Sequence, residues 1–222
     1  MWGVAPLDNP DTKTKYESFG QPMKITLPPN LWRRGELVKR LDVPKSLITD
    51  TVYLGDFGLA TKVGTDVRHK MLSPLEIFFH APERFHNVNP SFASDMWSYM
   101  CIFIELYLGF VSWEKDNYFS MIEKMVRVLG PLPKQWKGCY NSYVTTFSKC
   151  DNSWYDQRRK PSRDFNLESL IKRERPEVSE VERNHLLNIL FKGFSYSPQD
   201  RLSARELLQD PSFQAIMEIH CR

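Results

Sequence analysis

The sequence predicts a mainly α-helical fold with one short β element. Residues 95–110 are apolar on almost every side, which is typical of a helix at the centre of a core. Residues 179–182 and 203–206 each have the Ser-x-x-Glu spacing of a capping box, a motif that begins helices. Residues 51–54 are rich in β-branched and aromatic side chains, which favours a strand. After residue 60 the pattern indicates helices and loops almost throughout.

The first part of the chain, residues 1–50, is interpreted as a loop-rich lead-in. Prolines are frequent there, and apolar residues are few and aperiodic, so the pattern of an independent domain is missing. We expect one short helix within it, near Leu37–Leu41. Residues 59–80 mix Gly, Ser, Pro and charged residues, which indicates a loop. The predicted organisation is therefore a lead-in at 1–50 and one helical lobe at 51–222.

Helical patterns recur in the second part of the chain. An amphipathic segment ends at Gly130-Pro131, and an irregular insert is expected at about 137–178. Pro211 interrupts the helix that begins at the second capping box. The expected helices after the central one are 117–129, a short one near 167–171, one after Ser179, one after Ser203 and a last one at 212–219.

The overall composition is that of an ordinary soluble globular protein. Of 222 residues, 41% are hydrophobic and 26% are charged. The net charge of +3 arises from 30 basic and 27 acidic residues, a balance too even to favour nucleic acid or an anionic membrane as partner. One local run, Arg158-Arg159-Lys160 with Arg163, is basic. A solvated loop is the favoured interpretation of this run, and a docking site for an acidic partner is the alternative.

The cysteines indicate a reducing compartment. Cys101, Cys139, Cys150 and Cys221 form no C-x-x-C pair, so a zinc site has little support. Residues 1–10 lack the pattern of a secretory leader, and the longest apolar run is too short to span a bilayer. We expect an intracellular protein, in the cytoplasm or nucleus, with its cysteines present as buried thiols.

Asp56 is the residue with the clearest chemical signature. It lies in Leu54-Gly55-Asp56-Phe57-Gly58-Leu59-Ala60, where an apolar strand delivers one carboxylate into a turn flanked by glycines. Such a carboxylate holds Mg²⁺ against phosphate groups in phosphoryl transfer, because hard cations prefer oxygen ligands. An Asp-Phe-Gly tripeptide alone is a weak signal, and a plain turn is the alternative.

Further motifs follow Asp56 in order along the chain. They are Ala81-Pro82-Glu83, Ser94-Asp95-Met96-Trp97-Ser98, Leu129-Gly130-Pro131-Leu132-Pro133 with Trp136, and Ser197-Pro198-Gln199-Asp200-Arg201. With Asp56-Phe57-Gly58, this set resembles the C-terminal lobe of a eukaryotic Ser/Thr protein kinase over about residues 51–217. The Leu-Gly-Pro-Leu-Pro-x-x-Trp element is similar to the branch of cyclin-dependent, mitogen-activated and SR-protein kinases. The spacer Tyr16–Pro22 resembles fungal SR-protein-kinase-like proteins.

The resemblance implies roles by position. Asp56 corresponds to the metal-binding Asp, with Phe57 and Gly58 beside it in the cofactor site; ATP and Mg²⁺ are the cofactors of full-length family members. Glu83 is expected to pair with a buried Arg201, and two unrelated surface charges are the alternative.

Trp97 and Asp95 are expected to be structural. Asp95 corresponds to an Asp that binds the catalytic-loop backbone in the family; because that loop is missing here, capping of its own helix is favoured. The sequence departs from the family pattern at His80 and Met100, where Arg and Gly are usual. These departures put the geometry of the activation segment in doubt but leave the fold prediction intact.

Several catalytic parts are missing from the sequence. Residues 1–55 contain no G-x-G-x-x-G loop, no V-A-I-K-like strand and no H-x-D-x-K-x-x-N loop. We therefore expect an incomplete kinase fold, the C-terminal part of a longer kinase, with no catalytic residue and negligible ATP binding. Apolar residues near the missing half, namely Phe57, Leu59 and the strand Val52–Leu54, are expected to lack cover.

Three functional interpretations follow from these features. The first is part of a Ser/Thr kinase that phosphorylates proteins with ATP, inactive as this chain alone. The second is a non-catalytic, pseudokinase-like module that docks a partner protein through its insert and basic run. The third is a structural remnant without a selected role. The sequence leaves the oligomeric state open.

Overall fold

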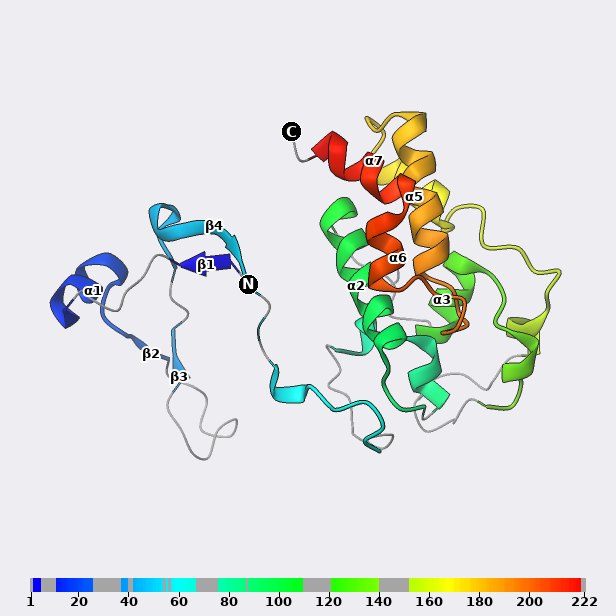
Figure 1. The fold of residues 1–222 in the computed structure, drawn as a ribbon, viewed down its shortest axis with the longest axis horizontal. Coiled ribbons are helices and arrows are strands. Elements are labelled where there is room, and N and C mark those ends of the chain that lie inside the picture. Colours follow the sequence, from blue (N-terminus) through cyan, green and yellow to red (C-terminus); the bar gives the residue numbers. More distant parts are fainter. Residues whose placement is uncertain are drawn as a thin grey trace. The chain divides into compact units, whose positions relative to one another are not determined.

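The structure is a computed structural model. It describes residues 2–4, 11–25, 37–39, 42–53, 55, 57–66, 76–86, 88–109, 121–139 and 152–220. The chain folds as two compact units, Met1–Thr61 and Lys62–Arg222 (Figure 1). The second unit is mostly helical, so the predicted mainly α fold class is confirmed. The predicted domain division after residue 50 stays a prediction.

Two small antiparallel sheets form much of the first unit. β1 (Trp2–Val4) pairs with β4 (Ile48–Val52), and β2 (Lys24–Ile25) pairs with β3 (Leu37–Val38). The predicted strand before Asp-Phe-Gly therefore exists, but it begins and ends earlier than expected. No residue of this unit whose burial the structure describes is buried.

The lead-in contains a helix that the sequence did not indicate, and a strand at the first two residues of the helix that it did. α1 (Thr12–Phe19) begins where the side chain of Asp11 accepts a hydrogen bond from the Thr14 backbone N–H at 2.8 Å. The short helix expected near Leu37–Leu41 is wrong at Leu37–Val38, because these residues pair with β2 as a strand. Residues 40 and 41 lie outside the described part.

The second unit is built from helices that pack around α2 and α5 (Figure 1). α5 contacts α2, α4 and α7, and α6 contacts α7. Of the predicted insert, the described part contains a short 3-10 helix with buried Trp154 and Tyr155, and α4. The helix bounds are α2 (Phe92–Leu108), α3 (Met121–Leu129), α4 (Leu167–Glu174), α5 (Glu180–Gly193), α6 (Ala204–Gln209) and α7 (Pro211–His220).

α2 provides the centre of the core, as its composition predicted. Trp97, Met100, Cys101 and Ile104 are completely buried on it. Burial is one-sided, however, because other apolar side chains of the same helix remain exposed, namely Phe92, Tyr99, Ile102 and Leu106. The expectation that the helix is covered on every side is therefore wrong within the described residues.

The beginning of α2 also differs from the prediction. Ser91 is the N-cap, and it exchanges hydrogen bonds with Ser94 in a capping box, so the helix begins at Phe92. Asp95 therefore lies inside the first turn and does not cap the helix. A carboxylate in the first turn still favours the helix, because the N-terminal end of the helix dipole is positive.

Both predicted Ser caps begin helices, but only one capping box is complete. At α6, Ser203 and Glu206 make the reciprocal contacts of the box. At α5, Ser179 accepts from the Glu182 backbone N–H at 3.1 Å. The Glu182 side chain does not return to the cap. It accepts hydrogen bonds from other parts of the unit instead.

The described residues bear on two further expectations. Cys101 is buried but Cys139 is exposed, so the prediction of buried thiols is wrong for Cys139; Cys150 and Cys221 lie outside the described part. In the part of the chain that the structure describes, every helix is too short or too polar to cross a membrane.

Candidate functional site

Of the predicted cofactor-binding residues, Phe57 and Gly58 belong to the described part of the structure. Asp56 lies outside the described residues, so its role as a metal ligand stays a prediction. Phe57 and Gly58 belong to a single 3-10 turn, Phe57–Leu59, in the first unit. The Phe57 side chain is 65% exposed, as expected for an apolar residue without cover. Across the described ranges, His, Cys, Asp and Glu side chains nowhere gather in threes around a potential metal site.

The structural residues of the prediction do come together. Glu83 lies in a short 3-10 helix, Pro82–His86, and Arg201 lies in the loop between α5 and α6. Arg201 Nη1 donates to Glu83 Oε1 at 2.8 Å and Nη2 donates to Oε2 at 2.9 Å. The side chains are 0% and 4% exposed, so this is a buried, bidentate ion pair between residues that are distant in sequence.

Arg201 has an acceptor for each of its five N–H groups, the full capacity of a guanidinium. Besides the two bonds to Glu83, Nε donates to the Ser195 carbonyl at 3.0 Å and Nη1 to the Ala93 carbonyl at 2.6 Å. Nη2 donates to the Tyr196 carbonyl at 3.3 Å. A buried charge that is paired and fully hydrogen-bonded holds the three segments in one arrangement.

Trp97 forms the floor beneath this pair. The Arg201 guanidinium lies 5.1 Å from the centre of the indole ring, within the range of a cation–π interaction. Phe194 packs edge-on against Trp97, with the two ring centres 5.0 Å apart. The motif around Asp95 and the motif around Arg201 are therefore joined through Trp97, while the Asp95 side chain itself is exposed.

The segment that carries Glu83 is fastened to α2 at two further points. The Ser98 hydroxyl donates to the Phe79 carbonyl at 2.8 Å, and the Ser94 hydroxyl donates to Glu83 Oε1 at 3.4 Å. Nearby, burial lowers the pKa of His86 to about 4, although the charge of Glu83 raises it in part. His86 is consequently neutral at pH 7 and acts as a packing group.

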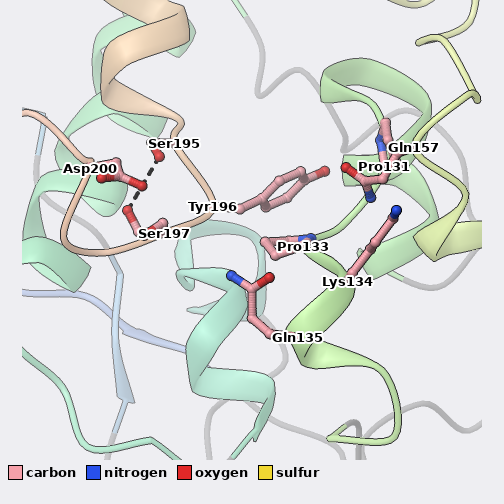
Figure 2. Close-up of a pocket in the computed structure, with 9 residues that line it drawn as sticks. All are labelled: Pro131, Pro133, Lys134, Gln135, Gln157, Ser195, Tyr196, Ser197 and Asp200. Atoms are coloured by element: carbon pink, nitrogen blue, oxygen red, sulfur yellow. Dashed lines mark hydrogen bonds between the residues drawn. The ribbon is translucent and has the colours of Figure 1, made fainter.

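An open hollow of about 540 Å³ shares two residues with this network. Figure 2 shows Lys134 and Gln157 on one side of it, Ser197 and Asp200 on the other, and Tyr196 between them. The complete lining is Pro131, Pro133, Lys134, Gln135, Gln157, Ser195, Tyr196, Ser197 and Asp200.

The walls of the hollow are fixed to one another by hydrogen bonds. Gln157 Nε2 donates to the Leu132 carbonyl at 2.8 Å, and the Tyr196 hydroxyl donates to the Gly130 carbonyl at 3.0 Å. Burial raises the pKa of Tyr196, so this hydroxyl remains a donor at any physiological pH. The sequence indicated neither Gln157 nor the hollow, because the segments meet only in the folded chain.

These features define a helical lobe in which a buried Glu–Arg pair links the core to the segment that follows Asp-Phe-Gly in the sequence. A family model described as protein kinase domain matches residues 44–213. The chain therefore belongs to the protein kinase domain family. Its predicted relationship to Ser/Thr kinases of the SR-protein-kinase branch is confirmed by similarity to known kinases.

The two relatives compared below are longer than this chain. It is 29% identical over 180 residues to the human dual specificity protein kinase CLK1, covering 78% of this chain and 34% of that protein. It is 31% identical over 199 residues to the dual specificity protein kinase lkh1 of Schizosaccharomyces pombe, covering 87% of this chain and 28% of that protein. The chain thus spans about a third of the length of the curated relatives it matches.

Proposed function

We propose that this chain supplies the helical lobe of an ATP-dependent kinase that phosphorylates Ser and Thr side chains of proteins. The buried Glu83–Arg201 pair is the observation that carries the proposal, because it anchors the segment that follows Asp-Phe-Gly. Within that kinase, Asp56 would hold Mg²⁺ against the nucleotide phosphates, with Phe57 and Gly58 beside it. Relatives are named dual specificity kinases, so Tyr is a further acceptor to test.

By itself, the chain is proposed to be inactive and to bind ATP negligibly. Phosphoryl transfer requires a phosphate-covering loop, a nucleotide-binding Lys and a catalytic Asp, and these 222 residues contain none of their motifs. We further propose an intracellular location, a protein substrate or partner, and no nucleic-acid or membrane ligand.

A kinase assay tests the inactivity proposal directly. The purified chain is incubated with radiolabelled ATP, Mg²⁺ and a mixed Ser/Thr/Tyr protein substrate, beside an Asp56→Ala variant as matched control. We expect no transfer above background from either protein and no thermal shift with Mg-ATP. Transfer by the chain that Asp56→Ala abolishes would refute the proposal.

Transcript sequencing tests the kinase proposal itself. An in-frame segment that encodes H-x-D-x-K-x-x-N upstream of Met1 is the expected result, because phosphoryl transfer needs that loop. A stop codon directly upstream of Met1, in cells where the protein accumulates, would contradict it. That result would favour the second candidate, a non-catalytic binding module. The open hollow beside the basic run is the observation in favour of this candidate.

A further inference from the structure

The basic run Arg158–Lys160 is held along the wall of the hollow at both of its ends. Before it, the Gln157 amide donates to the Leu132 carbonyl at 2.8 Å. After it, the Ser162 backbone N–H donates to the Arg127 carbonyl at 2.8 Å. Leu132 lies within the Gly130–Pro133 turn, two residues of which (Pro131 and Pro133) line the hollow, and Arg127 lies just before that turn. The backbone of the run is therefore held at both ends, while the Arg158 and Lys160 side chains are exposed to solvent; the run and the neighbouring Lys134 are called the basic rim below.

The Pro161 ring adds a packing contact at the far end of this rim. A Cβ atom placed on Gly130 would lie 3.4 Å from Pro161 Cγ, so the ring rests against that turn. Gly130 has a φ of +99°, which a residue with a side chain rarely adopts. The local backbone thus brings the end of the basic run close to the hollow.

Exposed cations lie in the lining of the hollow and along the basic run. Lys134, Lys137, Lys160 and Arg163 are exposed, and none of them forms an ion pair with another described residue. Arg158 is different, because its Nε and Nη2 donate to the Asp156 carboxylate at 3.1 and 3.3 Å. Asp156 also interacts electrostatically with Lys134. Of the four exposed cations, Lys134 lines the hollow, beside Pro131, Pro133 and Tyr196, and Lys160 belongs to the basic run.

We propose that the hollow and its basic rim dock an acidic segment, rich in Asp and Glu, of a partner protein. Charge complementarity supports this occupant, and apolar side chains of the segment would rest on Pro131, Pro133 and Tyr196. The inference deepens the binding-module candidate and requires no phosphate transfer. Asp200 lies on the side of the hollow opposite Lys134. Because its carboxylate would repel other acidic residues, the acidic residues of the partner would bind on the Lys134 side.

Carboxylates suit this rim better than phosphates or nucleic acid. Phosphate recognition favours the free fork of an Arg. The fork of Arg158 is occupied by Asp156, and the cation that lines the hollow is Lys134 rather than an Arg. Single-stranded nucleic acid favours several exposed aromatic platforms. Trp154 and Tyr155 beside the run are buried, and the exposed Phe165 ring already stacks with the Arg127 guanidinium, 4.3 Å from the ring centre. Lysines at intervals along an extended rim fit carboxylates at intervals along a peptide.

Fluorescence anisotropy tests the docking site, with labelled octaglutamate as the probe and the full chain as the receptor. The variant Lys134→Glu/Lys160→Glu reverses two rim charges. The variant Lys62→Glu/Arg205→Glu is the matched control, because it changes the net charge equally at exposed residues away from the hollow lining. We expect saturable binding at 50 mM NaCl, weakened about tenfold by the rim variant and less than about twofold by the control.

A variant that is expected to strengthen peptide binding provides a second test. Asp200→Asn removes the one carboxylate that lines the hollow and is expected to strengthen octaglutamate binding about twofold. Equal weakening by the rim and control variants would reduce the effect to net charge and overturn the proposal. Absence of binding at about 1 mM peptide would overturn it as well. Tighter, rim-dependent binding of an octauridine RNA would replace it with a nucleic-acid site.

Discussion

Removing the charge of Glu83 is expected to destabilise the helical unit strongly. Glu83→Gln preserves the shape of the side chain but leaves the Arg201 guanidinium, which is 0% exposed, without its counter-ion. Breaking a buried pair in this way costs about 3–5 kcal/mol, because an uncompensated charge remains in a poorly solvated place. A domain of this size is stable by only about 5–15 kcal/mol, so the loss is a large fraction of the total.

The contacts of Arg201 explain why neighbouring groups cannot relieve this loss. Two of its N–H groups point at the Glu83 oxygens, and the other three are committed to backbone carbonyls. In the Gln variant one of the two carboxylate oxygens becomes an NH₂ donor, which faces another donor. The guanidinium then loses a hydrogen bond as well as its opposite charge.

Urea unfolding followed by tryptophan fluorescence measures the effect, because Trp97 lies directly beneath the pair. Glu168→Gln is the matched control, since Glu168 pairs with Lys172 at 2.5 Å on an exposed helix face. Its expected cost is about 0.3–0.5 kcal/mol. The reasoning fails if Glu83→Gln is no more destabilising than this control.

A double-mutant cycle separates the pair from general packing. Glu83→Leu alone leaves the Arg201 guanidinium buried and unpaired, and Arg201→Met alone does the same to the Glu83 carboxylate. The double variant Glu83→Leu/Arg201→Met removes both charges. The double variant is expected to be more stable than the sum of the single losses by up to about 3 kcal/mol. Additive losses would show that the two side chains contribute independently.

Two further predictions concern the packing and the acid stability of the helical unit. Gly193→Ala is expected to lower the free energy of unfolding in urea by about 1–3 kcal/mol, because the added Cβ would lie 2.5 Å from Met100 Cγ. Adding Met100→Ala to that variant should recover part of the loss. Equal stability of Gly193→Ala and the unchanged chain would contradict the close approach. Burial would raise the pKa of Glu182, but hydrogen bonds from Tyr107 and His220 outweigh it and hold that pKa below its usual value. The stabilisation by the ionised Glu182 carboxylate is complete above about pH 4.3, the pKa in the unfolded chain, and is lost as the pH falls through the lower pKa of the folded chain. Glu182→Gln should therefore reduce the decrease in the free energy of unfolding between about pH 5 and 3. The same decrease in the variant and the unchanged chain would refute the assignment.

Local signals predicted the helices after residue 160 well. Ser203 and Glu206 needed only each other to form their box, and that box is complete. Ser179 began its helix as predicted, but Glu182 found stronger partners in Tyr107 and His220. A capping box competes with tertiary contacts for its Glu, and the sequence pattern does not contain those contacts.

The lead-in was predicted poorly, for a related reason. α1 contains no buried residue, so the hydrophobic periodicity that normally indicates a helix is absent. The Asp11 cap was its one local signal. Leu37 and Val38 adopt a strand only because β2 is there to pair with them, and the spacing of two-residue strands is not visible in a sequence.

The candidate site shows the same division between local and distant information. The Glu83–Arg201 contact followed from a resemblance, because its partners occupy recognisable motifs. The hollow did not, since Gln157 has no motif of its own and reaches the Leu132 carbonyl only through the fold of the insert. Sequence alone located the basic run, but its fixed position beside the hollow required the structure.

α2 shows most clearly what composition does not determine. Side chains that are apolar all round predicted cover on every side, yet Leu106 is 82% exposed while Ile104, two residues away, is completely buried. Packing of one apolar face against the core is enough to stabilise the helix, so the fold of the described unit does not require the other apolar face to be buried. Composition therefore shows which side chains a helix has on each face, whereas packing against neighbouring segments determines which face is buried in the core.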